Sequence, residues 1–337
     1  MTPLEELLRE LVLREGPIPF RRFMELALYH PEYGYYRCGR DPFGRSGDFF
    51  TAEQLQPVYG FLMAAAFAPL YEELGEPPDF AVVELGAGRA EMAPAFARWR
   101  YVPVEFGRAS LPETITGVVL ANEFFDALPV DLAVRREAGW RLMRVDWNGE
   151  RFVWQEAEPA EGAVAEYLER HVPVAEEGAL AEVHLEALAW VERIAQRLER
   201  GFLVVVDYGY TEREHGLFAR GTLMSYRRHR ACEDVLAGPG ERDITALVPF
   251  TALERHAAAC GLHTVRLERL ARFLLEAAGR APLEALLAEG SEAERLRRRL
   301  QWKTLLLAFG ESFRVLVSRK REQGRRGNEK GPEGIGA

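Results

Sequence analysis

Apolar side chains recur at helical spacing near the start of the chain, at Leu4, Leu7, Leu8, Leu11 and Val12. Residues 30–51 are then rich in glycine, proline and aromatic residues, which predicts a loop. Residues 54–74 return to a helical pattern with many apolar positions. The first expected unit is therefore a helical N-terminal segment over residues 1–75 that carries a Gly/aromatic loop.

Short apolar runs alternate with helical stretches over residues 76–134. The runs Phe80–Leu85, Tyr101–Glu105 and Gly117–Ala121 predict strands, and Glu91–Trp99 predicts a helix after the first of them. Strands that alternate with helices are typical of a mostly parallel sheet with helices on both faces. The expected fold class is therefore α/β, with a Rossmann-like doubly wound sheet.

The same sheet is expected to resume over residues 201–318. Phe202–Val206 is a continuous apolar run, as in a strand that is buried on both faces. Residues 262–267 and 313–317 are later strand candidates. The polar, glycine-rich residues 320–337 are expected to form a disordered tail.

Residues 135–200 break this rhythm. Two alternating runs, Trp140–Val145 and Arg151–Gln155, flank Asn148-Gly149, which is a turn signal typical of a β-hairpin. The residues that follow, 159–200, have a largely helical pattern. We therefore expect an inserted hairpin-plus-helix subdomain between the two parts of the sheet.

Composition excludes several classes of protein. The chain has 337 residues, and its 43 basic against 52 acidic residues give a net charge of −9, which argues against nucleic-acid binding. No apolar run approaches the roughly 18 residues of a membrane-spanning helix, and the first residues do not resemble a signal peptide. Three well-separated cysteines indicate neither a disulfide framework nor a metal site. We expect a cytoplasmic protein without membrane insertion or a metal, and the sequence leaves its oligomeric state open.

The strongest local signal is a strand that runs into a glycine turn, Glu84-Leu85-Gly86-Ala87-Gly88. Glycines at such a turn let the backbone approach a nucleotide ligand. A dinucleotide site needs a third glycine, and that position is Glu91, whose charge is unfavourable beside a pyrophosphate. Glu84 instead suits the ammonium and sulfonium groups of S-adenosylmethionine. Glu105 ends the next strand, where a carboxylate can accept both ribose hydroxyls. The sequence therefore predicts S-adenosylmethionine as cofactor, ahead of NAD.

Polar residues also end two further strands. Asn122, Glu123 and Asp126 follow the third apolar run, and Asp207 follows the run at 202–206. Ligands of open α/β sheets bind outside the carboxyl ends of the strands. We therefore expect Asn122 beside the cofactor and the three acids near the transferred methyl group. Simpler interpretations stay open, with Asn122 as a helix N-cap, Asp126 as a surface acid and Asp207 as part of a plain turn.

With several other ordered motifs, these residues resemble the MidA-like family of S-adenosylmethionine-dependent methyltransferases. That family includes a mitochondrial complex I assembly factor that is a protein arginine methyltransferase. The resemblance runs from Pro17 to Val317 and rests on motifs spread along the chain: His30-Pro31-Glu32-Tyr33-Gly34-Tyr35-Tyr36, Gly47-Asp48-Phe49-Phe50-Thr51, Glu84-Leu85-Gly86-Ala87-Gly88-Arg89, Asn122 to Val130, Asp207-Tyr208-Gly209, Asp243-Ile244-Thr245 and Gly310-Glu311-Ser312-Phe313. It implies a seven-stranded methyltransferase sheet with an added N-terminal segment and an insertion.

The resemblance also implies that the loop of Gly47, Asp48 and Phe49, with Thr51, covers the cofactor. The chain departs from the family directly after this loop. Where the family continues Thr-Ser-Pro-Glu, Thr51 is followed by Ala52-Glu53-Gln54, so that an acid stands one place earlier. Residues 106–117 lack the family's acid on the adenine side, and the sequence assigns no adenine contact.

Arginine methylation of a protein, a subunit of respiratory complex I, is the function that the resemblance implies. A guanidinium arrives charged, since its pKa is above about 12, and it must approach a cationic sulfonium. Carboxylates can offset this repulsion and hold the planar guanidinium through two hydrogen bonds. Glu123, Asp126 and Asp207 are the expected catalytic residues, with Asp48 as the next candidate.

Three other functions stay open from the sequence. A non-catalytic assembly factor could use the aromatic loop and the insertion as an interaction surface. A small-molecule or nucleobase methyltransferase has weak support from Asn122-x-x-Phe125, which is similar to a motif of amino-group methyltransferases. An NAD enzyme is disfavoured by Glu91.

Overall fold

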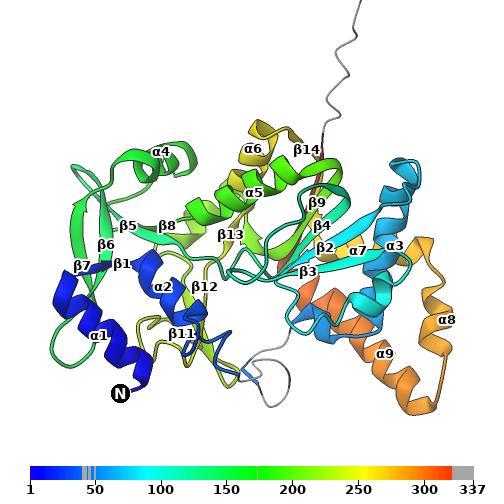
Figure 1. Ribbon diagram of the computed structural model, residues 1–337, viewed down its shortest axis with the longest axis horizontal. Helices are drawn as coiled ribbons and strands as arrows, with labels where there is room; N and C mark the ends of the chain where they lie inside the picture. The colour runs from blue at the N-terminus through cyan, green and yellow to red at the C-terminus, as the bar shows by residue number, and fades with distance from the viewer. Residues whose placement is uncertain (40–43, 45–46, 49–50, 173, 321–337) are drawn as a thin grey trace, which may run out of the picture.

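The structure is a computed structural model that describes residues 1–39, 44, 47–48, 51–172 and 174–320. At its centre lies a seven-stranded sheet with the order β14-β15-β9-β4-β2-β3, in which β13 pairs with the end of β9 (Figure 1). The strands β3, β2, β4 and β9 are parallel, whereas β15 runs antiparallel between β9 and β14. The strand bounds are β2 Ala81–Leu85, β3 Arg100–Val104, β4 Ile115–Asn122, β9 Leu198–Tyr210, β13 Val248–Pro249, β14 Leu262–Arg269 and β15 Phe313–Lys320.

Helices cover both faces of this sheet because successive strand residues point to opposite sides. On β4, Val118 and Leu120 share a buried cluster with helices α3 and α7, whereas Val119 and Ala121 share another with α5 and α6. The helix bounds are α3 Val58–Glu73, α5 Leu185–Arg197, α6 Phe250–Ala259 and α7 Leu270–Arg280. This arrangement confirms the expected mostly parallel, doubly wound α/β fold.

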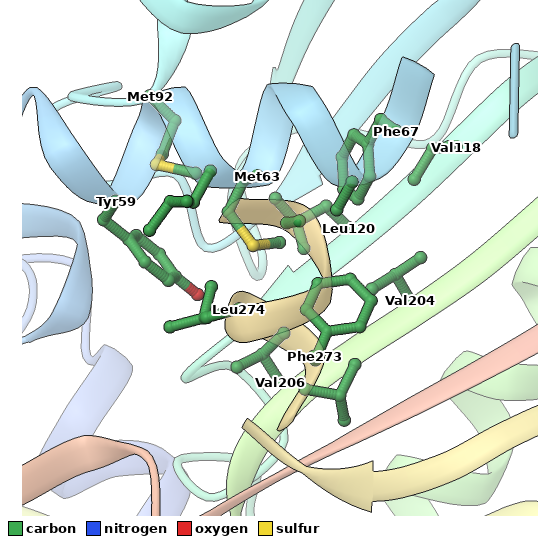
Figure 2. Packing of buried hydrophobic residues seen from close by; sticks show 14 of the residues in the cluster. Tyr59, Met63, Phe67, Met92, Val118, Leu120, Val204, Val206, Phe273 and Leu274 are labelled. Carbon is green, nitrogen blue, oxygen red and sulfur yellow. The ribbon is translucent and has the colours of Figure 1, made fainter. Parts of the chain in front are cut away.

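Helix α3 is largely apolar, and it is buried against the sheet. Figure 2 shows Met63 and Phe67 of α3 facing Leu120 of the sheet and Phe273 of α7. Tyr59, near the start of α3, is also fully buried, with its hydroxyl directed toward the carboxyl end of the sheet. This packing anchors the start of α3 next to the strand ends.

A second, five-stranded sheet forms the other side of the molecule (Figure 1). It is antiparallel, with the strand order β1-β6-β5-β8. The fifth strand, β7, also pairs with β6. The N-terminal helices α1 and α2 share its buried cluster. The bounds are α1 Pro3–Glu15, β1 Ile18–Pro19, α2 Phe20–Tyr29, β5 Asp131–Arg136, β6 Gly139–Trp147, β7 Phe152–Pro159, α4 Gly162–His171 and β8 Leu180–Val183.

The hairpin expected around Asn148-Gly149 is confirmed as β6 and β7. The side-chain oxygen of Asn148 accepts hydrogen bonds from the backbone N–H groups of Glu150 and Arg151, and Gly149 has a φ of 101°. Residues 159–200 are helical in α4 and α5 but also contain β8. Strand β8 follows a short turn and is too brief to stand out in the pattern.

The buried cores of the structure do not follow the boundaries of the expected units, residues 1–75 and 135–200. Helices α3 and α5 pack on the seven-stranded sheet, whereas α1 and α2 pack on the five-stranded one. The N-terminal segment and the insertion therefore share one core, and the ranges stay sequence-based predictions. Of the expected tail, Lys320 ends β15, and the rest lies outside the described residues.

The remaining helices, α8 and α9, add to the buried cluster of α3 and α7. Strands β10, β11 and β12 form a small three-stranded sheet. The bounds are β10 Met224–Arg227, β11 Arg230–Cys232, β12 Asp243–Thr245, α8 Leu283–Ala288 and α9 Glu292–Thr304. Within the described part of the chain, no helix is long and apolar enough to cross a bilayer. The same residues contain no group of three or more His, Cys, Asp or Glu that could hold a metal ion.

Candidate active site at the carboxyl ends of the strands

A cavity of about 750 Å³ opens where β2, β3 and β4 end. Gly86, Glu105 and Glu123 directly follow these three strands, and all three residues line the cavity. Gly88 and Asn122 line it as well. Ligands of open α/β sheets bind at this edge. The cavity therefore lies where the strand-end motifs lead us to expect a ligand.

The glycine turn after β2 has a backbone conformation that favours glycine. Gly86 and Gly88 have φ values of 68° and 52°, in the left-handed region. A Cβ atom on Gly86 would lie 3.0 Å from Cδ2 of Phe124. Glu105 Oε1 accepts a hydrogen bond of 2.7 Å from Gly88 N. The turn and the Glu105 carboxylate therefore form one wall of the cavity.

The helix expected over Glu91–Trp99 is wrong. A four-residue 3-10 helix, Ala93–Phe96, stands in its place. Ala90 has a φ of 54°, and Pro94 has no N–H to donate to a helix. In the described structure no α-helix begins at this turn.

Glu84 lies behind the cavity wall, and Glu53 lies on it. Glu84 is fully buried, and its Oε2 accepts a hydrogen bond of 2.5 Å from the Tyr101 hydroxyl. Glu53 lines the cavity, and its Oε1 accepts a hydrogen bond of 3.2 Å from Asn122 Nδ2. The Tyr59 hydroxyl donates a hydrogen bond of 2.6 Å to Asn122 Oδ1. Burial raises the pKa of both carboxyls, that of Glu84 to about 7.

A second group of acids, Glu123, Asp126 and Asp243, lines the same cavity. Glu123 Oε1 accepts a hydrogen bond of 2.9 Å from Ala52 N, and Asp243 Oδ1 accepts one of 2.7 Å from the Tyr36 hydroxyl. Burial raises the pKa of all three acids, that of Glu123 to about 8 and that of Asp243 to about 6. Repulsion within the group adds to this, because the charge of Asp126 raises the pKa of Glu123 and that of Asp243 raises the pKa of Asp126. Among the described residues, none of the three forms an ion pair with a basic side chain.

Asp207 supports the segment after β4 from behind. It is fully buried, and its Oδ2 accepts hydrogen bonds of 3.0 Å from Phe125 N and 3.3 Å from Asp126 N. Its Oδ1 accepts one of 2.8 Å from Tyr208 N. Glu123 at the start of this segment has a φ of 49°, a backbone conformation that needs support from its surroundings. Asp207 thus lies outside the cavity lining, unlike the position near the methyl group that the sequence suggests.

Four tyrosines, Tyr29, Tyr36, Tyr208 and Tyr226, line the cavity beside the acids. The rings of Tyr29 and Tyr36 stack with their centroids 5.5 Å apart. Burial raises the pKa of all four hydroxyls, so these side chains stay neutral. Aromatic faces attract cations, so the acids and the tyrosines together make a surface that suits a positively charged ligand.

The loop that the family resemblance assigns to the cofactor is only partly at the cavity. Thr51 lines the cavity, whereas Gly47 and Asp48 do not. Asp48 Oδ2 accepts a hydrogen bond of 2.9 Å from the Tyr35 hydroxyl, and Oδ1 accepts one of 2.6 Å from Arg228 N. Asp48 therefore ties the loop to the turn between β10 and β11. Phe49 lies outside the described residues.

The sequence motifs did not single out Glu53, Asp243 and three of the tyrosines, Tyr29, Tyr36 and Tyr226, as site residues. Asp243 stands in one of the family motifs, but spacing alone does not bring it to the strand ends. Its contact with Tyr36 joins residues 207 positions apart. The acid displaced by one place after Thr51 was the signal that could have found Glu53.

The groups in the cavity fit S-adenosylmethionine. The cofactor has a cationic methionine end, and Glu53 offers a carboxylate to its ammonium. The fully buried Glu84 behind it has an oxygen, Oε1, without a hydrogen-bond partner among the described residues. Glu105 offers a carboxylate to the ribose, and the Gly86 turn leaves no side chain in the way. The rings of Tyr29 and Phe106, whose centroids lie 4.5 Å apart, add an apolar surface next to Glu105.

Comparison with known proteins identifies the family. The family model described as "Putative S-adenosyl-L-methionine-dependent methyltransferase" matches residues 94–267. The chain is 30% identical to a protein from Burkholderia thailandensis whose crystal structure contains S-adenosyl-homocysteine, with a TM-score of 0.83 over 94% of this chain and 92% of that one. S-adenosyl-homocysteine is what remains of S-adenosylmethionine after methyl transfer.

Two relatives have names that describe an activity. "Protein arginine methyltransferase NDUFAF7 homolog, mitochondrial" of Drosophila melanogaster is 27% identical, over 93% of this chain and 84% of the relative. "Protein arginine methyltransferase NDUFAF7, mitochondrial" of Homo sapiens is 29% identical, over 76% of this chain and 69% of the relative. These findings confirm the resemblance seen in the sequence. The chain belongs to this family of Rossmann-like enzymes and is a methyltransferase that uses S-adenosylmethionine as its cofactor.

Proposed function

We propose that this methyltransferase transfers a methyl group to the guanidinium of an arginine side chain in a protein. The names of the relatives support a protein arginine as acceptor. The family resemblance further favours a subunit of respiratory complex I as the target. The compartment that we expect from the sequence is the cytoplasm, whereas the named relatives are mitochondrial.

The observation that carries the proposal is the group of Glu123, Asp126 and Asp243. These three carboxyls, of which Asp126 and Asp243 are buried and Glu123 is half-buried, repel one another, and the described part of the chain supplies no basic partner for them. Such an arrangement costs stability unless a ligand supplies positive charge. A guanidinium is planar and permanently charged, and it can donate hydrogen bonds to two carboxylates at once. This ligand chemistry matches the cavity better than a neutral or anionic acceptor.

We assign the cofactor to the wall formed by the glycine turn. Glu105 is proposed to accept the ribose hydroxyls, and the backbone at Gly86 and Gly88 to pass close to the cofactor. Glu53, rather than the buried Glu84, is proposed to contact the methionine ammonium, with Asn122 holding Glu53 in place. When bound, the cofactor supplies an electrophilic methyl group on a sulfonium.

The acceptor is proposed to lie against Glu123 and Asp126, with Asp243 as a third carboxylate. These side chains hold the guanidinium and offset its repulsion from the sulfonium. They also bring the reacting atoms into line, which is the main demand of such a transfer. Once ionised against the guanidinium, a carboxylate whose pKa is raised can take up the proton that the guanidinium nitrogen loses when it becomes methylated. Asp207 is proposed to act indirectly, by holding the backbone of this segment.

Mass spectrometry of complex I subunits from strains with and without this protein tests the proposal. We expect one arginine to carry a methyl group only in the strain with the intact gene. A strain that carries the Glu123→Gln variant is expected to lack the mark while the protein remains present. Identical methylation in all strains would reject a complex I subunit as the target, and a mark on another residue type would reject arginine as the acceptor.

A further inference from the structure

Two carboxyls, Glu53 and Glu84, lie within hydrogen-bonding reach of each other behind the glycine turn. Glu84 comes from the end of β2 and is fully buried. Its Oε2 accepts the hydrogen bond of 2.5 Å from the Tyr101 hydroxyl, and its Oε1 has no hydrogen-bond donor within the described residues. Glu53 comes from the short 3-10 helix Ala52–Gln54 and reaches the cavity. The pair therefore connects the buried edge of β2 with the cofactor site.

Each carboxyl of this pair accepts a hydrogen bond from one neighbouring side chain. Asn122 Nδ2 donates to Glu53 Oε1 over 3.2 Å. Because the Tyr59 hydroxyl donates to Asn122 Oδ1 over 2.6 Å, the amide has to present its NH₂ group to Glu53. On the Glu84 side, the Tyr101 hydroxyl is the fixed donor. Neither of these donors carries a positive charge.

Acidic groups from several elements act on the pair. Glu84, Glu123 and Glu91 each raise the pKa of Glu53 by repulsion, and Glu105 raises that of Glu84. Burial raises both pKa values further, that of Glu84 to about 7. Two adjacent carboxyls, of which Glu84 is fully buried and Glu53 half-buried, do not both ionise near neutral pH when only uncharged donors hold them, and they keep one proton between them. The unpartnered Oε1 of Glu84 is the atom at which such a proton would face Glu53.

We propose that Glu84 is a positioning residue for the methionine end of the cofactor, because it shares one proton with Glu53 that the cofactor's ammonium group displaces. This inference rests on the proposed contact between Glu53 and the ammonium. Before binding, two carboxyls and one proton carry a net charge of −1. After binding, two carboxylates and one ammonium also carry −1, and the displaced proton passes to the solvent. One cation replaces another, so the buried charge stays constant.

The exchange makes cofactor affinity depend on pH in a defined direction. The pair binds its proton in the empty protein and loses it in the complex, so affinity rises as pH increases from about 6 toward about 7.5. The amino group of the ligand has its own pKa near roughly 8, and measurements below pH 7 keep that group protonated. Glu123 also faces Glu53, and variants of the pair are therefore needed to separate its contribution.

Isothermal titration calorimetry at pH 6.5, in two buffers with different ionisation enthalpies, measures the protons released on binding. The ligands are S-adenosylhomocysteine, which has the ammonium, and 5′-methylthioadenosine, which lacks the amino-acid end. We expect S-adenosylhomocysteine to release about 0.5 to 0.8 proton and 5′-methylthioadenosine to release almost none. Glu84→Gln should remove most of the release, whereas the matched control Glu156→Gln, on the five-stranded sheet and paired with Arg136, should behave like the wild type.

Tyr101→Phe provides a second variant should Glu84→Gln fold poorly. Loss of the hydroxyl donor raises the pKa of the pair further, so proton release should persist to higher pH than in the wild type. Binding of S-adenosylhomocysteine with equal proton release in the wild type, Glu84→Gln and Tyr101→Phe would overturn the inference and leave the proposed function standing. Unchanged affinity for S-adenosylhomocysteine in Glu53→Gln would instead overturn the ammonium contact and this inference with it.

Discussion

Glutamates occupy two contrasting environments in this protein. On the face of β6 and β7, Glu156 Oε2 lies 2.7 Å from Arg136 Nη2, and its Oε1 lies 2.9 Å from Arg141 Nε. Hydrogen bonds from Arg136 lower the pKa of Glu156. In the cavity, burial raises the pKa of Glu123 to about 8, and the described residues provide no basic partner. The surface acid has its cation within the chain, whereas the cavity acid lacks one.

This difference indicates where the protein leaves charge for a ligand. Exposed ion pairs contribute little to stability, and they are common on surfaces. Buried acids that are held unpaired next to a cavity destabilise the empty protein, and they are more common at functional sites. The acids on the five-stranded sheet are therefore neutralised by arginines of the chain itself. The acids at the carboxyl edge of the seven-stranded sheet remain available to a cationic cofactor and a cationic acceptor.

The largest effect is expected from Glu123→Gln. The amide keeps the size of the side chain and an oxygen that can accept from Ala52 N, but it lacks the charge that offsets a guanidinium. We expect turnover to fall about 100-fold or more, while the affinity for S-adenosylmethionine stays within a few-fold. Methyl transfer and calorimetry on the same sample measure both. Lost cofactor binding with unchanged turnover per bound cofactor would move Glu123 out of the acceptor site.

Gly86→Val is expected to remove cofactor binding. The side chain has to adopt a φ of 68°, and its Cβ would lie 3.0 Å from the Phe124 ring. We expect affinity for S-adenosylmethionine to fall by at least about tenfold. Gly16→Val is the matched control, because Gly16 also has a positive φ, of 79°, but has no atom within 4 Å of its Cβ position. If both variants bind the cofactor equally well, the turn is not part of its site.

Glu53→Gln tests whether Glu53, which stands one position before the glutamate of the family pattern, contacts the cofactor. We expect cofactor affinity to fall about tenfold, the size of one lost charged hydrogen bond. Adding Gln54→Glu should not restore it, because the Gln54 side chain points back to Thr51 N, at 3.4 Å. Recovery in the double variant, measured by calorimetry, would show that an acid at either position serves.

The stability of the empty protein should depend on pH through Glu123. Its pKa is about 8 in the folded chain against an ordinary value of 4.5. The folded state therefore holds this proton more tightly, and its contribution to stability is full below about pH 4.5 and is lost as pH rises through 8. Thermal unfolding at pH 5 and pH 8 should show Glu123→Gln gaining about 2–4 °C over the wild type at pH 8 only. An equal difference in melting temperature between the variant and the wild type at both pH values would contradict a raised pKa for Glu123.

The smallest effect is expected on the surface. Glu156→Gln removes the charge that Arg136 and Arg141 share, but both arginines stay in contact with water. We expect the melting temperature to change by less than about 2 °C and turnover to stay the same. A large loss of turnover would mean that the five-stranded sheet takes part in catalysis, and the contrast between the two regions would fail.

Local patterns in the sequence predicted the sheet and part of the site. The strands β2, β4 and β9 are buried on both faces, so each stands out as a continuous apolar run. Gly86 follows such a run, and Glu105 follows the next strand along the chain, β3. These features need only neighbouring residues, which is why the cofactor could be inferred before the structure.

The rest depends on which way a side chain points and on distant contacts. Glu84 and Val82 are two residues apart and point to the α3 side, which is why Glu84 lies behind the cavity instead of in it. Asp207 points to backbone amides of the segment after β4. Asp243 reaches the cavity through a contact with Tyr36 across 207 positions. A strand-end position alone does not show these orientations.

The identity of the atom that receives the methyl group is the most direct test of a cationic acceptor in this cavity. The purified enzyme is incubated with S-adenosylmethionine that carries a deuterated methyl group and with extract from cells that lack this gene. Mass spectrometry then locates the label. We predict a deuterated methyl group on a guanidinium nitrogen of a protein arginine, and no transfer by Glu123→Gln. Label found solely on a neutral small molecule or a nucleobase would contradict the claim that the cavity acids hold a cationic acceptor.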